Sequence, residues 1–408
     1  MRTWSSSHEK ERIVSLPSHL EQTPDFSPTL GGPLYQMLQG VHLAGPTVEL
    51  QKRRVLLIIA ITWLPLLFLS AITGHFLGGQ GLPFLRDVET HVRFLVALPV
   101  LVVAELFVHQ RLPPALKLFL DRGVVTTEDT PKFHAAIEAA MRMRNSVPLE
   151  LALLVFAYTA GHWVWAHELT LGTATWYAVP DGNNIHLTLP GYWNAFVSVP
   201  IAQFILFRWY LGLAIWFWLL WRVSQLNLRL SPMHPDRAGG IGFLGESSYA
   251  FSPILFAQSA VLAGIIFGRI SYKGQSLISF EVTIVLLIGF FVLLILGPLT
   301  VFTPHLARAR RRGLSQYGTL ATSYVTDFHD KWVRGGGEGE AILGTADIQS
   351  LADLANSYTV VREMRIVPFA LSHVARLAII AGMPMLPLLL TIMPLHELVD
   401  RLIKVVFF

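Results

Sequence analysis

Residues 51–74 read QKRRVLLIIAITWLPLLFLSAITG, a polar and basic start followed by twenty residues without a charge. About twenty largely apolar residues are what an α-helix needs to cross the hydrocarbon core of a bilayer. Basic residues directly before such a run are typical of the helix end that stays in the cytoplasm. The stretch therefore predicts a membrane-spanning helix that starts on the cytoplasmic side.

Six further apolar runs follow, so the sequence predicts an all-α, polytopic transmembrane helical bundle of about seven spans. Hydrophobic residues make up 53% of the chain and charged residues 14%, whereas a soluble domain carries about 25% charge. There is no cysteine, which excludes disulfides, thiolate metal sites and cysteine nucleophiles. The expected spans are residues 55–74, 94–109, 147–165, 193–221, 249–269, 282–302 and 369–393.

Orientation follows from the distribution of Lys and Arg, because cytoplasmic segments carry the excess. With the N-terminus inside, 23 of the 31 basic residues are cytoplasmic, and residues 167–192 carry none. The basic pI of about 9.3 then reflects topology rather than nucleic-acid binding. We expect a multi-pass protein of the bacterial inner membrane. Its last apolar run either crosses the membrane completely or, because prolines interrupt it, turns back as a re-entrant hairpin. The expected segments are 1–50, cytoplasmic and largely disordered, and 51–408, a transmembrane domain with cytoplasmic helical insertions at 111–146, 222–247 and 304–368.

Ionisable residues inside apolar runs are costly and are therefore functional candidates. Glu105 needs a cationic partner, for which Arg376 is the first expectation and Arg208 the competitor. The spans contain more arginine than carboxylate, and a surplus buried cation favours an anion. The candidate ion pathway consists of Arg208, Glu105, Arg376, His373 and His109.

Two further features of the spans have structural interpretations. Arg269 ends the fifth run and Glu281 begins the sixth, so a structural ion pair is expected between them near the outer surface. Ala260, Gly264 and Gly268 recur every four residues, which lets another helix approach closely. Packing within one subunit is favoured over packing between subunits.

The loop at residues 230–245, LSPMHPDRAGGIGFLG, is the most distinctive segment between spans. One interpretation is a tight turn, because proline and glycine are typical turn residues. The favoured one is a polar site at the inner mouth of the bundle, with glycine N–H groups able to meet an anion. The residues of this inner-mouth loop are His234, Asp236, Arg237 and Gly240.

This loop, together with residues 327–332 (DFHDKW) and 344–347 (GTAD), resembles a group of uncharacterised bacterial polytopic inner-membrane proteins with an HPDRAGG-type loop. The resemblance would cover most of the membrane region. It implies a bacterial inner-membrane location and nothing about activity.

No cofactor or metal site is expected, with one alternative. A b-type haem needs two histidines that face each other across the bundle, and His75 and His162 could do so. No hydrolase, zinc-protease or phosphate-loop signature is present.

The residues therefore favour a channel or transporter for a small anion, assembled as a homo-oligomer in the lipid bilayer. The alternatives are a membrane-bound metal or haem redox enzyme and a non-transporting scaffold or sensor.

Overall fold

The computed structural model describes residues 26–28, 31–33, 36, 48–78, 81–161, 163, 174–181, 184–335 and 345–391. It confirms an all-α polytopic bundle. The strands in this part of the chain are β1 (Ala178–Asp181) and β2 (Asn184–Leu187), which form one antiparallel hairpin.

Most helices join end to end into longer ones. The α-helices are α2 (Val48–Thr62), α3 (Leu64–Ile72), α4 (Val88–His91), α5 (Leu98–Asp121), α6 (Thr130–Arg144), α7 (Val147–Phe156), α9 (Leu189–Trp193), α10 (Val199–Ser224), α11 (Phe243–Ser247), α12 (Ser252–Lys273), α13 (Glu281–Leu296), α14 (Thr303–Phe328), α15 (Ala346–Arg362) and α16 (Leu371–Gly382). Short π-helical or 3-10 segments connect several of them, including η3 (Val92–Ala97), η6 (Asn194–Ser198), η9 (Gly297–Phe302) and η11 (Met383–Thr391).

Six of these continuous helices in the described residues are long and apolar enough to cross a membrane. The third predicted span is a shorter apolar helix, Val147–Thr159, and residues 164–173 beyond it are not described. The 34-residue helix Val88–Asp121 and the 36-residue helix Leu189–Ser224 are each about 50 Å long. Because a hydrocarbon core is about 30 Å thick, both helices extend well beyond it.

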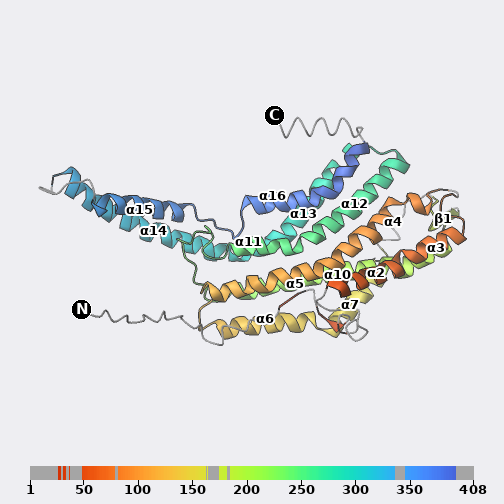
Figure 1. The fold of residues 1–408 in the computed structure, drawn as a ribbon, viewed down its shortest axis with the longest axis horizontal. Helices are drawn as coiled ribbons and strands as arrows, with labels where there is room; N and C mark the ends of the chain where they lie inside the picture. The colour runs from red at the N-terminus through yellow and green to blue at the C-terminus, as the bar shows by residue number, and fades with distance from the viewer. Residues whose placement is uncertain are drawn as a thin grey trace, which may run out of the picture.

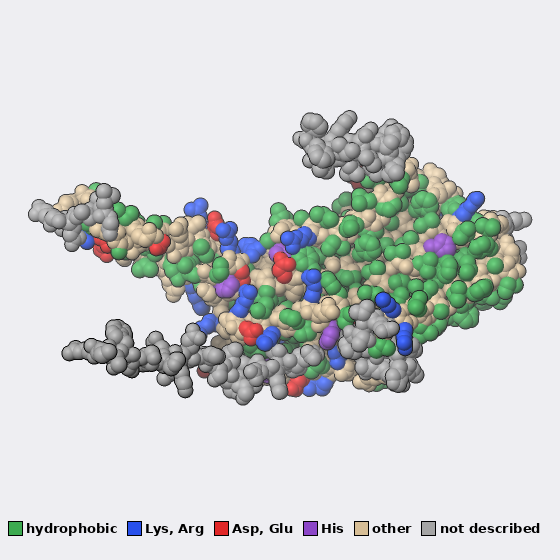
Figure 2. All heavy atoms as spheres, in the orientation of Figure 1, with side chains coloured by type: hydrophobic (Ala, Val, Ile, Leu, Met, Phe, Trp, Pro, Cys, Tyr) green, Lys and Arg blue, Asp and Glu red, His purple; other side chains and the backbone are tan. Residues whose placement is uncertain are grey.

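The two ends of the bundle differ. At one end, here the hairpin end, the β-hairpin packs beside the start of α4, where Trp176 Nε1 donates to Asp87 at 2.8 Å. At the other end, here the arm end, α14 and α15 form a helical pair that projects far from the body (Figure 1). Charged side chains gather where this arm meets the body, whereas hydrophobic side chains dominate the visible face towards the hairpin end (Figure 2).

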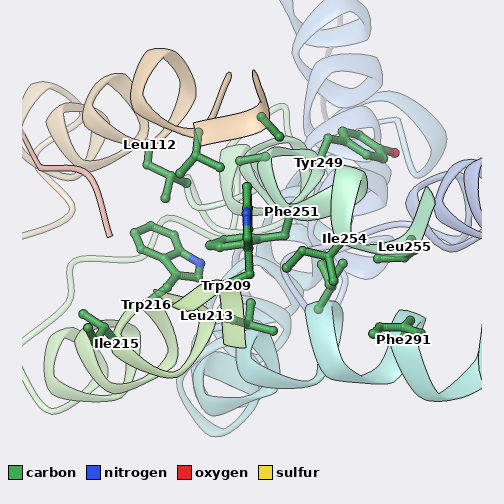
Figure 3. Packing of buried hydrophobic residues seen from close by; sticks show 14 of the residues in the cluster. Leu112, Trp209, Leu213, Ile215, Trp216, Tyr249, Phe251, Ile254, Leu255 and Phe291 are labelled. Carbon is green, nitrogen blue, oxygen red and sulfur yellow. The ribbon is translucent and has the colours of Figure 1, made fainter. Parts of the chain in front are cut away.

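The core lies where α5, α10 and α12 pack together (Figure 1). Trp209 and Trp216 of α10 and Phe251 at the start of α12 are almost completely buried and lie close together in it (Figure 3). Such aromatic side chains bury the largest apolar areas. The contact therefore holds α10 against the start of α12.

The seventh predicted span is present as α16 followed by η11, which contains Pro387. It packs along α12, and Met385 and Leu388 reach the cluster that contains Ile266 and Phe280 near the hairpin end. The described residues of this segment therefore run from one end of the bundle towards the other, as a complete span does.

The small-residue stripe packs within the chain, as predicted. A Cβ atom at Gly264 of α12 would lie 2.9 Å from Glu89 Cα of α4, whereas one at Gly268 would meet nothing within 4 Å. Gly264 therefore sets the distance between α4 and α12.

Replacing Gly264 with alanine should lower the free energy of unfolding by about 1–3 kcal/mol, because the added methyl group overpacks against backbone. Gly268→Ala is the matched control and should raise it by up to about 1 kcal/mol through helix propensity. Thermal unfolding of the purified protein measures both. Equal midpoints for the two variants would contradict the close contact.

Candidate functional site

Several charged residues lie at one depth in the bundle. Counted from the hairpin end, Arg54, Glu105 and Arg208 each lie 17 to 19 residues along their continuous helices, or about 27 Å at 1.5 Å per residue. Two neighbours, Arg144 at the end of α6 and Glu150 in the first turn of α7, line the same small pocket as Glu105 and Arg208. These five residues are called the charged layer here.

Glu105 pairs with Arg54 of α2, and the expectation that it pairs with Arg376 or Arg208 is wrong. Arg54 Nη1 donates to Glu105 Oε2, and Nη2 donates to Oε1 at 3.1 Å. The two side chains are only 3% and 4% exposed. Two parallel hydrogen bonds of this kind are what a guanidinium makes best with a carboxylate. The pair fixes the register of α2 against α5.

Arg208 of α10 pairs instead with Glu150 of α7, at 3.6 Å. Arg144 lies close by, and its burial together with the positive charge of Arg208 lowers its pKa below the ordinary value. The described part of the charged layer thus contains three guanidinium groups and two carboxylates.

The described part of the N-terminal segment is packed against this layer, whereas the sequence analysis expected disorder. Arg144 Nη1 donates to the Ser27 carbonyl at 2.7 Å, and Arg208 Nη2 donates to the Gly31 carbonyl at 2.8 Å. Phe26 is fully buried, with its ring 6.1 Å from that of Trp216. Residues 26–28 and 31–33, called the strap here, therefore cover the charged layer.

Gly31 and Gly32 are required by the strap itself. Their φ angles are +144° and +92°, which L side chains rarely adopt. A Cβ atom at Gly31 would also lie 2.6 Å from the Arg144 guanidinium.

Two hollows lie near Trp209. The larger, of about 190 Å³, lies between η3–α5, α10 and α12, and its polar lining consists of Arg93, Gln203 and Gln258. The smaller, of about 20 Å³, is the pocket in the charged layer, with room for about one water molecule. The Trp209 indole lines the smaller hollow and donates to the carbonyl of Leu101, which lines the larger one, at 3.1 Å.

The charges nearer the hairpin end are arranged differently from the prediction. Arg93 pairs with Glu89 one turn earlier, and Arg269 lies within electrostatic range of Glu89. In the described structure Arg269 makes no ion pair with Glu281, so the expected pair between them is wrong. Close packing at Gly264 brings α12 beside Glu89, which gives Arg269 a nearer carboxylate.

The loop after α10 is closed on itself by Asp236. Its carboxylate accepts hydrogen bonds from the N–H groups of Ala238 (2.8 Å), Gly240 (3.1 Å) and Gly242 (2.9 Å). Partial burial favours the neutral acid, but these three donors and the nearby His234 ring hold the pKa of Asp236 below its ordinary value. The glycine N–H groups expected to meet an external anion are therefore occupied by the chain's own carboxylate.

The loop also joins α5 to the base of the arm. Arg122 of α5 donates to the Gly240 carbonyl at 3.0 Å, and Arg365 donates to the Asp236 carbonyl at 2.7 Å. Arg237, with a φ of +52°, pairs with Glu363 at 2.9 Å. The tight-turn interpretation thus accounts for the geometry of His234, Asp236, Arg237 and Gly240.

The remaining predicted pathway residues do not join the charged layer. Arg376 and His373 of α16 face Glu246 of α11, at 4.0 Å and 3.3 Å. His109 lies one turn beyond Glu105 on α5, and its buried Nδ1 has no hydrogen-bond partner in the described structure. Of the proposed haem pair, His75 bonds Thr73, whereas His162 lies outside the described residues.

Within the described ranges, no group of three or more histidine, aspartate or glutamate side chains is placed to hold a metal ion. Comparisons of the chain with protein-family models, with curated proteins and with solved structures found no match. Function is therefore inferred from the geometry of the described residues.

Sequence reasoning missed Arg54, Arg144 and Glu150. Arg54 and Glu150 each stand at the edge of an apolar run, where a charge is explained by membrane orientation or by the helix end alone. Neighbouring helices run in opposite directions, so Arg54 is counted back from the end of its helix and Glu105 and Arg208 forward from the start of theirs. Counted in this way, the three residues lie at the same depth. That signal was present in the sequence.

Glu105→Gln should lower the free energy of unfolding by about 3–5 kcal/mol, because it leaves the Arg54 charge buried without its counter-ion. Chemical or thermal unfolding in detergent measures the loss. Arg54→Leu with Glu105→Leu should recover most of it, and Glu138→Gln, in an exposed pair with Arg142, should cost at most about 1 kcal/mol. A double variant as unstable as Glu105→Gln would contradict a charge-based cost.

The Asp236 carboxylate should make stability depend on acid pH. Its folded pKa lies below the ordinary 3.8, so its contribution is complete above that pH and is lost as pH falls through the folded pKa. Asp236→Asn should cost about 2 kcal/mol at neutral pH, and the difference from wild type should shrink below about pH 3.8. Unfolding curves across pH test this, with exposed Asp327→Asn as control. A pH-independent difference would contradict it.

Proposed function

We propose that this integral membrane protein is a channel or transporter that moves a small anion between α5 and α10, from the bacterial cytoplasm across the inner membrane or in the reverse direction. The arm end would be cytoplasmic, because most of the Lys and Arg residues lie there.

The observation that carries the proposal is a pair of neighbouring hollows: a mainly apolar one with three polar side chains in its wall, and a smaller one in the charged layer that Trp209 lines. Polar side chains are expensive in a bilayer and mark solute pathways when they face a cavity. Gln203, Gln258 and Arg93 face the larger hollow inside the membrane-spanning part of the bundle. Both helices beside it also contain a π-helical turn, η3 and η6, and such turns are frequent at functional sites.

The charges support an anion as the solute. In the described charged layer, Arg144 and Arg208 lie close to each other and line one pocket. The carbonyl oxygens of Ser27 and Gly31 accept from these two arginines. An anion would present the same kind of acceptor, so the strap occupies the place that a permeating anion would take.

Current across a planar bilayer that contains the purified full-length protein, under an asymmetric KCl gradient, tests the proposal. Arg208→Gln removes a positive charge from the charged layer and should lower the preference for chloride over potassium by about tenfold, because one charge at this depth dominates the local potential. Glu150→Gln removes a negative charge from the same layer and should shift the reversal potential in the opposite direction. Shifts of the same sign would contradict the charge argument.

The reversal potential of the wild-type protein shows which ion passes. A wild-type reversal potential towards chloride supports the proposal, and one towards potassium overturns anion selectivity. No chloride current, together with no chloride uptake into liposomes by folded protein, overturns transport.

Trp209→Ala should raise the flux several-fold, because it removes the indole that lines the smaller hollow and bonds Leu101 in the wall of the larger one. Trp221→Ala, on the same helix but 45% exposed, is the matched control and should leave flux unchanged. The same current measurement reads both. Equal currents in Trp209→Ala and wild type would place the barrier elsewhere.

A second candidate function, docking of a partner or of a further copy of the chain, is supported by the arm. Leu320, Val325 and Ile348 are 54%, 50% and 42% exposed on α14 and α15, and a two-helix arm leaves such side chains in water. Replacing them with serine should abolish oligomers measured by light scattering while leaving chloride flux intact. Unchanged oligomers would remove the arm from assembly.

A further inference from the structure

A second pocket lies away from the charged layer, on the opposite side of α5. It has a volume of about 440 Å³ and lies between α5, the start of α12, and α16. Its polar groups are Arg111, Arg376, Glu246, Tyr249 and Ser252; its apolar wall consists of Phe107, Ile379 and Ile380.

The pocket lies at the boundary between apolar surface and polar end. On α5, Arg111 is the first arginine after the apolar run, and the Val103 side chain two turns before it is 51% exposed. On α16, Ile379 is 63% exposed and lies one turn beyond Arg376. Exposed apolar side chains on these helices would face lipid tails, so both arginines would lie at the depth of the lipid headgroups.

The charge of the pocket favours an anionic group. Glu246 lies 4.0 Å from Arg376 and 3.3 Å from His373, so its negative charge is paired with the two basic side chains of α16. Arg111 packs over the Phe107 ring, 4.2 Å from its centre, and makes no ion pair with any described residue. The Arg111 guanidinium is therefore available to bind an anionic group in the pocket.

A buried tyrosine hydroxyl lies in the wall of the pocket. Tyr249 is only 7% exposed, and its hydroxyl lies beside the Arg376 guanidinium. Its ring stacks on His373 and lies beneath Arg376, while its hydroxyl points away from the hydrophobic core (Figure 3). Arg376 and the Tyr249 hydroxyl therefore offer neighbouring donors to a ligand oxygen in the pocket.

We infer that this pocket binds the phosphate group of an anionic phospholipid in the leaflet at the arm end. Arg111 and Arg376 would bind the phosphate oxygens, and the Tyr249 hydroxyl would donate to one of them. The acyl chains would lie along Phe107 and Ile379. Basic pockets between transmembrane helices at this leaflet are a recurrent kind of lipid site, and the inference does not depend on the proposed transport.

Native mass spectrometry of the full chain with added phosphatidylglycerol or phosphatidylcholine tests this inference. Wild type should bind phosphatidylglycerol about tenfold more tightly than phosphatidylcholine. Arg111→Gln with Arg376→Gln should remove that preference. The matched control, Arg222→Gln with Arg229→Gln, changes two exposed arm-end arginines outside the pocket and should keep it.

Tyr249→Phe separates ligand binding from folding. It removes a hydroxyl beside Arg376 but keeps the ring that stacks on His373, so the thermal midpoint should change little. Affinity for phosphatidylglycerol should fall about tenfold, the value of one hydrogen bond to a charged group. A lower midpoint with unchanged lipid affinity would overturn the assigned role.

Competition with inorganic phosphate shows whether the pocket binds a phospholipid headgroup or a soluble phosphate ion. Failure of millimolar phosphate to displace phosphatidylglycerol supports the lipid site. Displacement by phosphate, with phosphate binding alone to wild type and not to the double arginine variant, overturns the lipid in favour of a soluble oxyanion. Equal phosphatidylglycerol binding in all variants overturns the pocket itself.

Discussion

The buried ion pair between Arg54 and Glu105 is the interaction on which the rest of the bundle depends. Both side chains are almost completely removed from water, where an unmatched charge costs several kcal/mol. Sliding α2 against α5 by one turn would separate the two groups and expose neither to solvent. The pair therefore fixes one register for these helices, and Arg208 with Glu150 does the same for α10 and α7.

The same requirement explains why parts of the chain occupy sites suited to anions. Asp236 takes up three backbone N–H groups of its own loop, and carbonyl groups of the strap accept from Arg144 and Arg208. Such donors cannot be left buried without acceptors. The two acceptors are held differently. The Asp236 loop is bonded to residues at the end of α5 and at the base of the arm, whereas the strap belongs to the segment that precedes α2.

The sequence predicted the features that depend on neighbouring residues. The predicted helical insertion at 111–146 contains the helix Thr130–Arg144, with Pro131 in its first turn, and the apolar runs located the long membrane helices. Partnerships across the bundle were not predictable in this way. Arg376 seemed a suitable partner for Glu105, but the choice depends on which face of α5 each helix packs against. Likewise Arg269 lies beside Glu89 because Gly264 lets α4 approach.

The strap has a consequence for how strongly the charged layer would bind any anion. An acceptor on the same chain competes at an effective concentration that reaches millimolar for short connections. A soluble anion would have to exceed that concentration, or bind with more charge than a carbonyl oxygen carries, to replace Ser27 and Gly31. A full negative charge on two guanidinium groups does provide the stronger bond. Strap and anion would therefore alternate at Arg144 and Arg208, and the anion concentration would set which one occupies them.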